Sequence, residues 1–371
     1  MTAHLKPFGA QIQRLIDRHH LTEEETHELF RQVLVNEQPD LHQGAFLAAL
    51  VAKGETEAEI VGAWRAIREF DTVQASDDWP GPLFENSGTG MDRLKTFNVS
   101  SAAAVVAAAC GVTMARHGAR AITSFCGTVD LLEAVGIDVD CPVPVVEQSI
   151  QKAGIGLFNG MSPQVHPGAL GRILSQIRFG STLNLAASLA HPCRPTLGLR
   201  GVYAPSLLIP TATVMRSIGY QRGLVVHGKD AATGLGMDEI SVCGPTSVVE
   251  FWGPGQRAYE IHPEEMGLAV RSFQEIAATG QVETEAARFL RVLAGRGESA
   301  CADFTCANAG AILYVAGQCD TIRQGVEKSR ETLASGRALT QLRQWVEAQN
   351  RNPAAGRERL ESMLDMAQAL G

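Results

Sequence analysis

Polar and apolar residues recur with a helical period through the first 70 residues of the chain. The sequences "TEEE" at 22–25 and "TEAE" at 56–59 each place a glutamate three residues after a threonine. In this capping-box pattern the two side chains satisfy backbone N–H groups at the start of a helix. The amphipathic runs "LFRQVLV" and "IVGAWRAIREF" follow. The pattern therefore predicts a small, all-helical amino-terminal domain over residues 1–75.

The pattern changes after residues 71–82, "DTVQASDDWPGP", a polar stretch ending in Pro and Gly that is typical of a linker. Short apolar runs then alternate with helix-like stretches, the runs being "VTMARHG", "GIGLF", "LGLRGVY" and "GLVVHG". This alternation predicts a large α/β domain with a mostly parallel central sheet. Helices from about 166–190 complete the helical domain, which leaves residues 76–165 and 191–371 to the α/β domain. Near the carboxyl end, "TLASGRALTQLRQWVEAQN" predicts one amphipathic helix that closes this domain.

Composition and charge narrow the class of protein. Of the 371 residues 45% are hydrophobic and 19% are charged, an ordinary globular balance. The formal net charge of −8 argues against nucleic-acid binding, since phosphate contacts need a basic surface. We find neither an apolar signal-peptide core nor a run of membrane-spanning length, so we expect a soluble cytoplasmic protein. The eight cysteines lack zinc-site spacing; we expect buried free thiols, with a thiolate nucleophile at Cys126 as the alternative.

A glycine-rich loop and a polar cluster precede the alanine-rich run at 102–109. A Gly-x-Gly turn lets backbone N–H groups approach a ligand, and the start of a helix near Ser100 suits a phosphate. A plain turn followed by an N-cap serine is the alternative. The residues concerned are Gly88, Thr89, Gly90, Asp92, Asn98, Ser100 and Ser101.

A second turn follows a predicted strand in "ARHGARAITSFCGTVDLLEAVG" at 115–136. Arg116 and Arg120 bracket His117, and the turn at 126–128 enters a helix with Asp130 in its first turn. Two such turns at the carboxyl ends of strands fall where open α/β sheets bind ligands. Together they predict an anion site, although His117 taken by itself is more typical of a buried structural imidazole.

Asp238 and Glu239 are adjacent acids that follow a glycine-rich turn, in "GLGMDEISV". Adjacent acids on an exposed turn are usually solvated. In an anion-binding cleft they would instead be oxygen ligands for Mg²⁺, which binds through one or two carboxylates together with substrate phosphates.

Taken together, these segments resemble the anthranilate phosphoribosyltransferases, which are of glycosyltransferase family 3 type. That family carries, in order, a GTGGD loop, an N-[IV]-S-T segment, a KHGN segment, an SGSAD turn and a DE pair. This chain has "GTGMD" at 88–92, "NVSS" at 98–101, "RHGA" at 116–119, "CGTVD" at 126–130 and "DE" at 238–239. The segments "FLAALVAKGETEAEI" and "NAGAILYVAG" are also similar, so the resemblance runs almost end to end.

The resemblance implies a homodimer that uses Mg²⁺ to transfer ribose 5-phosphate from phosphoribosyl pyrophosphate to the amine of anthranilate, releasing pyrophosphate in tryptophan biosynthesis. It implies no catalytic acid, base or nucleophile, only positioning and charge stabilisation. By matching position it implies that the donor is bound by Gly88, Thr89, Gly90, Asp92, Asn98, Ser100, Ser101, Arg116 and Thr128. It implies that the acceptor is bound by His117, Gly118, Ala119, His166 and either Arg172 or Arg178. It implies that the metal is held by Ser100, Asp238 and Glu239.

The departures from the family pattern concern the acceptor more than the donor. Met91 stands where the family keeps a glycine, and Ala119 lacks an amide that faces the acceptor in the family. The arginine that pairs with the anthranilate carboxylate in the family falls near Leu174, which is why Arg172 and Arg178 are considered as replacements. Loss of such a contact costs about 1.5–3 kcal/mol.

Two other functions stay open from the sequence. Pyrimidine nucleoside phosphorylases share this architecture, so the chain could instead be a phosphoribosyltransferase or a nucleoside-phosphorylase-like enzyme with a different aromatic base as acceptor. The chain could also be a non-catalytic relative that binds a nucleic acid or another partner. The charge of −8 and the Asp238–Glu239 pair count against the second alternative.

Overall fold

The computed structural model describes residues 5–90, 92–120, 126–177 and 179–369. It contains two compact units, one of Met1–Ala75 with Gly160–Cys193 and one of Ser76–Asn159 with Arg194–Gly371. Residues 160–165 and 191–193, which the sequence analysis gave to the α/β domain, group with the first unit. Met91 and Arg178 lie outside the described residues.

The first unit consists of helices, as predicted. Both predicted capping boxes are present: Thr22 and Thr56 each accept from the backbone N–H of a glutamate three residues later, and that glutamate accepts in return. Helix α2 packs on α4, α1 on α3, and α4 on α9, around a core that includes Phe8, Phe30 and Phe46. The helices are α1 (Leu5–Ile16), α2 (Glu23–Leu34), α3 (Asp40–Lys53), α4 (Glu57–Phe70), α8 (Leu170–Ile177) and α9 (Thr182–Leu189).

The second unit is built on a mixed sheet whose first five strands are parallel. In the described part the strand order is β3-β2-β1-β4-β5-β7-β8, with β6 beside β5; strands β6, β7 and β8 are antiparallel to their neighbours. The four apolar runs predicted as strands form β2 to β5. The strands are β1 (Phe84–Gly88), β2 (Met114–Gly118), β3 (Ile155–Asn159), β4 (Leu197–Gly201), β5 (Arg222–Lys229), β6 (Gly236–Met237), β7 (Thr246–Trp252) and β8 (Gly255–Ile261).

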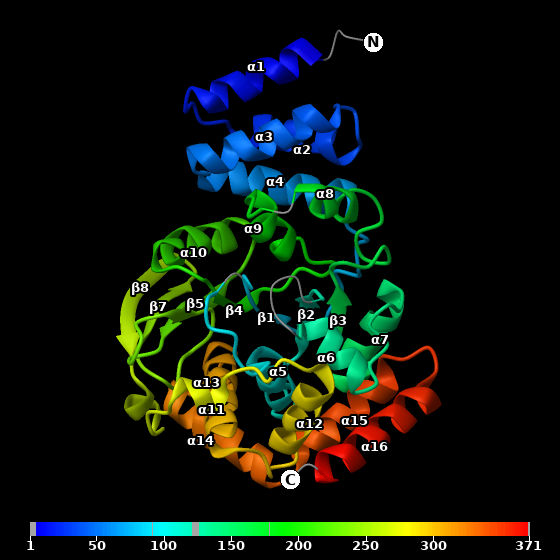
Figure 1. Ribbon diagram of the computed structural model, residues 1–371, viewed down its shortest axis with the longest axis vertical. Helices are drawn as coiled ribbons and strands as arrows, with labels where there is room; N and C mark the ends of the chain where they lie inside the picture. Colours follow the sequence, from blue (N-terminus) through cyan, green and yellow to red (C-terminus); the bar gives the residue numbers. More distant parts are fainter. Residues whose placement is uncertain (1–4, 91, 121–125, 178, 370–371) are drawn as a thin grey trace. The chain divides into compact units, whose positions relative to one another are not determined.

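Helices flank this sheet. Helix α10 packs on β5 and β7. Helices α5 and α13 pack on each other, α5 also on β1 to β3 and α13 on β4 and β5, and Figure 1 shows this pair on the side of the sheet opposite α10. Both α5 and α13 are rich in alanine and buried along most of their length. The helices are α5 (Val99–Ala109), α6 (Thr128–Ala134), α7 (Val143–Ala153), α10 (Leu208–Ser217), α11 (Phe273–Ile276), α12 (Val282–Leu293), α13 (Ser299–Val315), α14 (Ile322–Ala334), α15 (Arg337–Ala348) and α16 (Pro353–Ala369).

The expectation of a single closing helix near the carboxyl end was wrong. Helix α14 ends at Ala334 and α15 begins at Arg337, because Gly336 between them takes a left-handed conformation with φ of 73°. Helix α16 then follows. Within the described ranges no helix is both long and apolar enough to cross a membrane.

Candidate active site

Glycines at the ends of three adjacent strands create room for an acidic segment. The Asp238–Glu239 segment, which follows β6, lies against Gly88 on β1, Gly201 on β4 and Gly228 on β5. A Cβ atom on Gly201 would lie 1.5 Å from the backbone oxygen of Asp238, and one on Gly228 would lie 2.4 Å from that of Glu239. A Cβ on Gly88 would lie 2.2 Å from Oδ2 of Asp238. Any side chain at these positions would force the acidic segment away from the strand ends.

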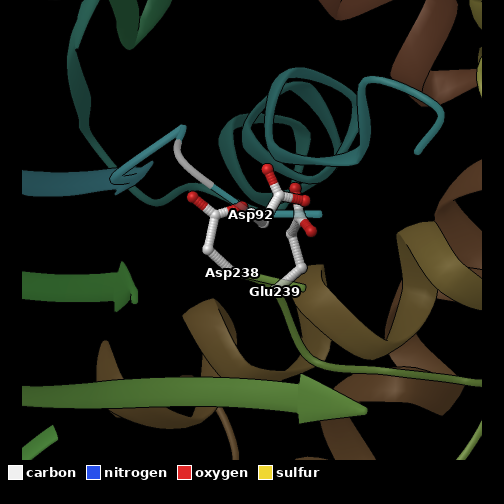
Figure 2. A group of neighbouring side chains, drawn as sticks. All are labelled: Asp92, Asp238 and Glu239. Carbon is white, nitrogen blue, oxygen red and sulfur yellow. The ribbon is translucent and has the colours of Figure 1, made fainter. Parts of the chain in front are cut away.

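Three carboxylates meet above these glycines. One oxygen from each of Asp92, Asp238 and Glu239 lies within 4.8 Å of the others. Figure 2 shows Asp92 approaching from the segment between β1 and α5, and the other two from the segment after β6. The backbone N–H of Gly90 donates to Oδ2 of Asp238 at 2.7 Å, and the hydroxyl of Thr89 lies 3.5 Å from the same oxygen. The structure thus brings the predicted glycine loop and the predicted DE pair together.

Electrostatics at this cluster favour a bound cation. Burial, reinforced by the charge of Asp238, raises the pKa of Asp92 to about 6, and Lys95, whose Nζ lies 3.1 Å from Asp92, opposes that shift. Burial raises the pKa of Glu239 well above its usual value, and both aspartates add to the shift. Oε2 of Glu239 is buried without a hydrogen-bond partner among the described residues. A hard divalent cation such as Mg²⁺ fits this oxygen set, because it would relieve the repulsion and supply the missing partner.

The second predicted group, the NVSS segment, is held by Arg116. The guanidinium donates from Nε to Oδ1 of Asn86 at 3.1 Å, from Nη1 to Oγ of Ser101 at 2.8 Å and from Nη2 to Oγ of Ser100 at 3.1 Å. Arg116 is 1% exposed. Burial lowers its pKa to about 10, against the opposing charge of Glu85, so the side chain stays protonated at neutral pH. Its three described hydrogen-bond partners are the side chains of Asn86, Ser100 and Ser101.

A buried ion pair lies on the neighbouring strands. Nη2 of Arg200 on β4 is 3.5 Å from Oε2 of Glu85 on β1, and both side chains are 1% exposed or less. Arg200 also donates to the hydroxyl of Ser87. The carboxylate oxygens of Glu85 accept no hydrogen bond from the described residues, so its charge is balanced by the two arginines near it.

The remaining predicted residues of the α/β unit lie at the end of β2 and the start of α6. His117 is buried, and the space beside Gly118 is filled by Thr128, whose Cγ2 lies 3.0 Å from where a Cβ would be. The carbonyl of Ala119 accepts from Val129 N at 3.3 Å. Burial and the charge of Glu285 raise the pKa of Cys126 to about 12, so it is a neutral thiol rather than a thiolate nucleophile.

The acceptor residues predicted from 166–178 belong to the helical unit. Nδ1 of His166 lies 2.6 Å from the carbonyl oxygen of Asp71. The guanidinium of Arg172 donates to Oε1 of Gln43 and to the carbonyl of Val33, each at 2.9 Å. These bonds give Arg172 a structural function within its own unit, which weakens its prediction as an acceptor ligand. Arg178, the other replacement considered, lies outside the described residues.

Several residues at the site were not predicted from the sequence: Glu85, Asn86, Arg200, Gly201 and Gly228. A detectable signal was present, because strands of a parallel sheet covered on both faces normally read as apolar runs. Strand β1 instead carries "ENS", and β4 carries an arginine within "LGLRG". Polar residues within a central strand therefore indicate a polar network below the strand ends.

Comparison with known proteins gives a consistent result. Residues 81–339 match the α/β domain model of the glycosyl transferase family, and residues 11–71 match its helical bundle domain model. The chain is 36% identical over 341 residues to the anthranilate phosphoribosyltransferase of Methanothermobacter marburgensis, covering 90% of this chain and 96% of that protein. The crystal structure of the Thermus thermophilus enzyme of that name aligns with a TM-score of 0.82 and 34% identity, covering 91% of this chain and 98% of that chain.

A more distant structure shares the fold. The anthranilate phosphoribosyltransferase of Saccharomyces cerevisiae, in complex with PRPP and Mg, aligns with a TM-score of 0.80 at 21% identity. That alignment covers 92% of this chain and 98% of the yeast chain.

Asp92, Asp238 and Glu239 are called the acid trio from here on. Neutralising one of them should raise the Tm in the absence of metal and reduce the rise in Tm that Mg²⁺ causes. We expect Glu239→Gln to melt at a higher temperature than the wild type in chelator, because it removes a buried carboxyl group whose raised pKa makes its ionised form unfavourable in the folded protein. We expect Mg²⁺ to raise the Tm of the wild type and to bind the variant at least about tenfold more weakly. Calorimetric melting with and without Mg²⁺ measures both effects.

The matched control is Asp303→Asn, since Asp303 is a buried acid that accepts from Arg271 and Arg330 away from the trio. Its Tm should fall, while its Mg²⁺ response stays that of the wild type. An unchanged Mg²⁺ response in Glu239→Gln would contradict the metal assignment.

Adding a methyl group at Gly201 should displace the acidic segment. Gly201→Ala would place Cβ against the backbone of Asp238, so we expect a loss of stability of about 1–3 kcal/mol and loss of the Mg²⁺-induced rise in Tm. Gly81→Ala is the control, because no atom lies within 4 Å of its Cβ position. A normal Mg²⁺ response in Gly201→Ala would show that the close approach is not required.

Proposed function

The chain belongs to the glycosyl transferase family that joins a helical bundle domain to an α/β domain, and on this premise we propose its reaction. It transfers ribose 5-phosphate from phosphoribosyl pyrophosphate to the amine of anthranilate or a related aromatic acceptor, and it releases pyrophosphate. The observation that carries the proposal is the acid trio at the glycine ends of β1, β4 and β5. Relatives with the name anthranilate phosphoribosyltransferase support it over 90% of the chain.

The chemistry of this transfer matches what the site offers. As the bond to pyrophosphate breaks, positive charge develops at C1 of the ribose and negative charge on the departing group. The protein must then hold the pyrophosphate and place an amine in line, with no strong nucleophile of its own. We assign Gly88, Thr89 and Gly90 to the pyrophosphate, because they match the glycine loop of the family and lie beside the acid trio. We assign Asn98 and Ser100 to the remaining phosphate and the ribose.

Mg²⁺ is the cofactor that we assign to Asp92, Asp238 and Glu239. When bound, it would neutralise charge on the pyrophosphate and so stabilise it as a leaving group. The yeast structure in complex with PRPP and Mg supports Mg²⁺ as the cofactor. The trio contributes hard oxygen ligands, of which Asp92 and Glu239 have a raised pKa, and Lys95 limits the net charge beside them.

The acceptor assignment rests on fewer matching residues. His117, Gly118 and His166 match the family, whereas Ala119 replaces its acceptor-facing asparagine and Leu174 replaces its carboxylate-binding arginine. Arg172, the described replacement, is hydrogen-bonded to Gln43 and Val33. For this reason the proposal includes aromatic amines other than anthranilate. The homodimer and the cytoplasmic location stay predictions from the resemblance and the sequence.

The experiment is a three-component assay with purified protein. Phosphoribosyl pyrophosphate, Mg²⁺ and anthranilate are mixed, and both pyrophosphate release and the loss of anthranilate fluorescence are followed. We expect turnover that requires all three components and falls at least tenfold in Asp238→Asn. The control is again Asp303→Asn, which should keep its activity at a temperature below its Tm.

Each other outcome has a defined meaning. Donor binding without consumption of anthranilate would contradict the anthranilate assignment and direct the search to a panel of aromatic amines and bases. Phosphate-dependent release of a base from a nucleoside would indicate the phosphorylase-like activity. Absence of donor binding in the presence of Mg²⁺ would overturn the proposed function.

A further inference from the structure

The side chain of Asn308 on α13 is hydrogen-bonded at both ends of its amide group. Its Oδ1 accepts from the backbone N–H of Ile240 at 3.1 Å, and its Nδ2 donates to the carbonyl of Ile240 at 3.0 Å. Nδ2 also donates to the carbonyl of Phe304 at 3.0 Å, one turn earlier in the same helix. Asn308 is buried. The amide therefore pairs with both backbone polar groups of a single residue that lies 68 positions away in the sequence.

This pairing fixes the orientation of the Asn308 amide. Its NH₂ group has two hydrogens, and each is donated to one carbonyl. Turning the amide over would place the NH₂ group against the N–H of Ile240 and the amide oxygen against two carbonyls, so all three bonds would be lost. A side chain that only donates or only accepts cannot replace this arrangement.

Ile240 directly follows Glu239, so a bond to its backbone acts on the acidic segment. Before the acids, the segment is held by the pairing of β6 with β5. After Ile240, the backbone N–H of Ser241 donates to Oγ1 of Thr246 at 2.9 Å. Of these three attachments, the one made by Asn308 is nearest in sequence to Glu239, and it comes from a helix rather than from the sheet or the loop.

The acidic segment requires such an attachment because its carboxylates crowd one another. One oxygen from each member of the acid trio lies within 4.8 Å of the others, and carboxylates this close repel when they are ionised. The repulsion favours movement of the segment away from Asp92. Gly201 and Gly228 leave room for the segment to approach, but a missing side chain supplies no attraction. Asn308 supplies hydrogen bonds that oppose the repulsion.

The residue type suits this role. Asn308 borders the small hollow at the strand ends that Gly88, Asp238 and Glu239 also line. An aspartate at this position would add a fourth negative charge, and a lysine would bring a cation that competes with a metal ion. An asparagine binds the backbone and leaves the local charge unchanged, so the attraction for a divalent cation depends on the acids alone.

We propose that Asn308 is a positioning residue that pairs with the backbone of Ile240 and so holds Glu239 where the acid trio can bind a divalent cation. The inference rests on the proposed function and names a residue on which its metal site depends. Both hydrogens of the Asn308 amide are already donated to carbonyls, so the residue acts through Glu239 and not as a ligand of the metal or the substrate.

Binding of Mn²⁺ to the whole chain, without substrates, tests the proposal. Mn²⁺ takes carboxylate ligands as Mg²⁺ does, and its EPR signal measures the free ion. Asn308→Ala should bind Mn²⁺ about 10–100-fold more weakly than the wild type, the range for residues that orient metal ligands. If Asn308 acts through Glu239, the variant that combines Asn308→Ala with Glu239→Gln should bind within about threefold of the weaker single variant.

A second variant keeps one of the three bonds. The hydroxyl of Asn308→Ser can still donate to the carbonyl of Phe304 one turn earlier, but the side chain is too short to reach Ile240. Its Tm should therefore lie closer to that of the wild type than the Tm of Asn308→Ala. Its Mn²⁺ affinity should fall within the same range of about 10–100-fold, because the pairing with Ile240 is lost in both variants.

Two controls on the same helix separate positioning from a general loss of structure. Thr305→Val removes a buried hydroxyl that donates to the carbonyl of Cys301 at 2.8 Å, the same kind of bond that Asn308 makes to Phe304. Asp303→Asn, the control used above, should lower the Tm. Both should bind Mn²⁺ as the wild type does, at a temperature below the Tm of every variant.

The contrary results are distinct. Wild-type Mn²⁺ affinity in Asn308→Ala or in Asn308→Ser would overturn the positioning role. Losses that multiply when Asn308→Ala is combined with Glu239→Gln would show that Asn308 does not act through Glu239, which also overturns it. Either result leaves the proposed function intact, whereas a wild type that binds no Mn²⁺ would overturn the metal assignment and this inference together.

Discussion

The close approach of the Asp238–Glu239 segment to the ends of β1, β4 and β5 is the constraint on which the site depends. It is possible only because Gly88, Gly201 and Gly228 have no side chains. The approach places two acids beside Asp92 and aligns the Gly90 N–H with one of them. The same geometry therefore forms the turn at the strand ends and concentrates acidic groups whose repulsion a bound cation would relieve.

The buried charged side chains beneath the acid trio form a second network of interacting residues. Glu85 on β1 lies near Arg116 and Arg200, one from each neighbouring strand. Because an isolated buried charge is unstable, each of these groups keeps the others in place. Arg116 in turn directs the polar groups at the start of α5. The acid trio and the polar groups at the start of α5 thus lie at the same end of the parallel strands, where open α/β sheets bind ligands.

Local sequence patterns predicted many of the helices and strands, but they predicted few of the buried polar residues. Threonine and glutamate at fixed spacing predicted two helix starts, and the apolar runs predicted β2 to β5, because both signals depend on nearby residues. Glu85, Asn86 and Arg200 were missed because their partners come from other strands, and no spacing along the chain reveals that pairing. The break at Gly336 was missed because the helical period continues across it. Arg172 was predicted as an acceptor ligand from position alone, and its bonds to Gln43 and Val33 come from the packing of helices.

The central claim, a metal-dependent donor site at the acid trio, is tested most directly by diffraction from crystals grown with phosphoribosyl pyrophosphate and Mn²⁺ in place of Mg²⁺. Mn²⁺ scatters anomalously and takes the same oxygen ligands. The account predicts an anomalous peak at coordination distance from the carboxylates of Asp238 and Glu239, with the pyrophosphate of the donor over Gly88 to Gly90. A bound donor with no metal at these acids, or a metal held elsewhere in the protein, would contradict the account.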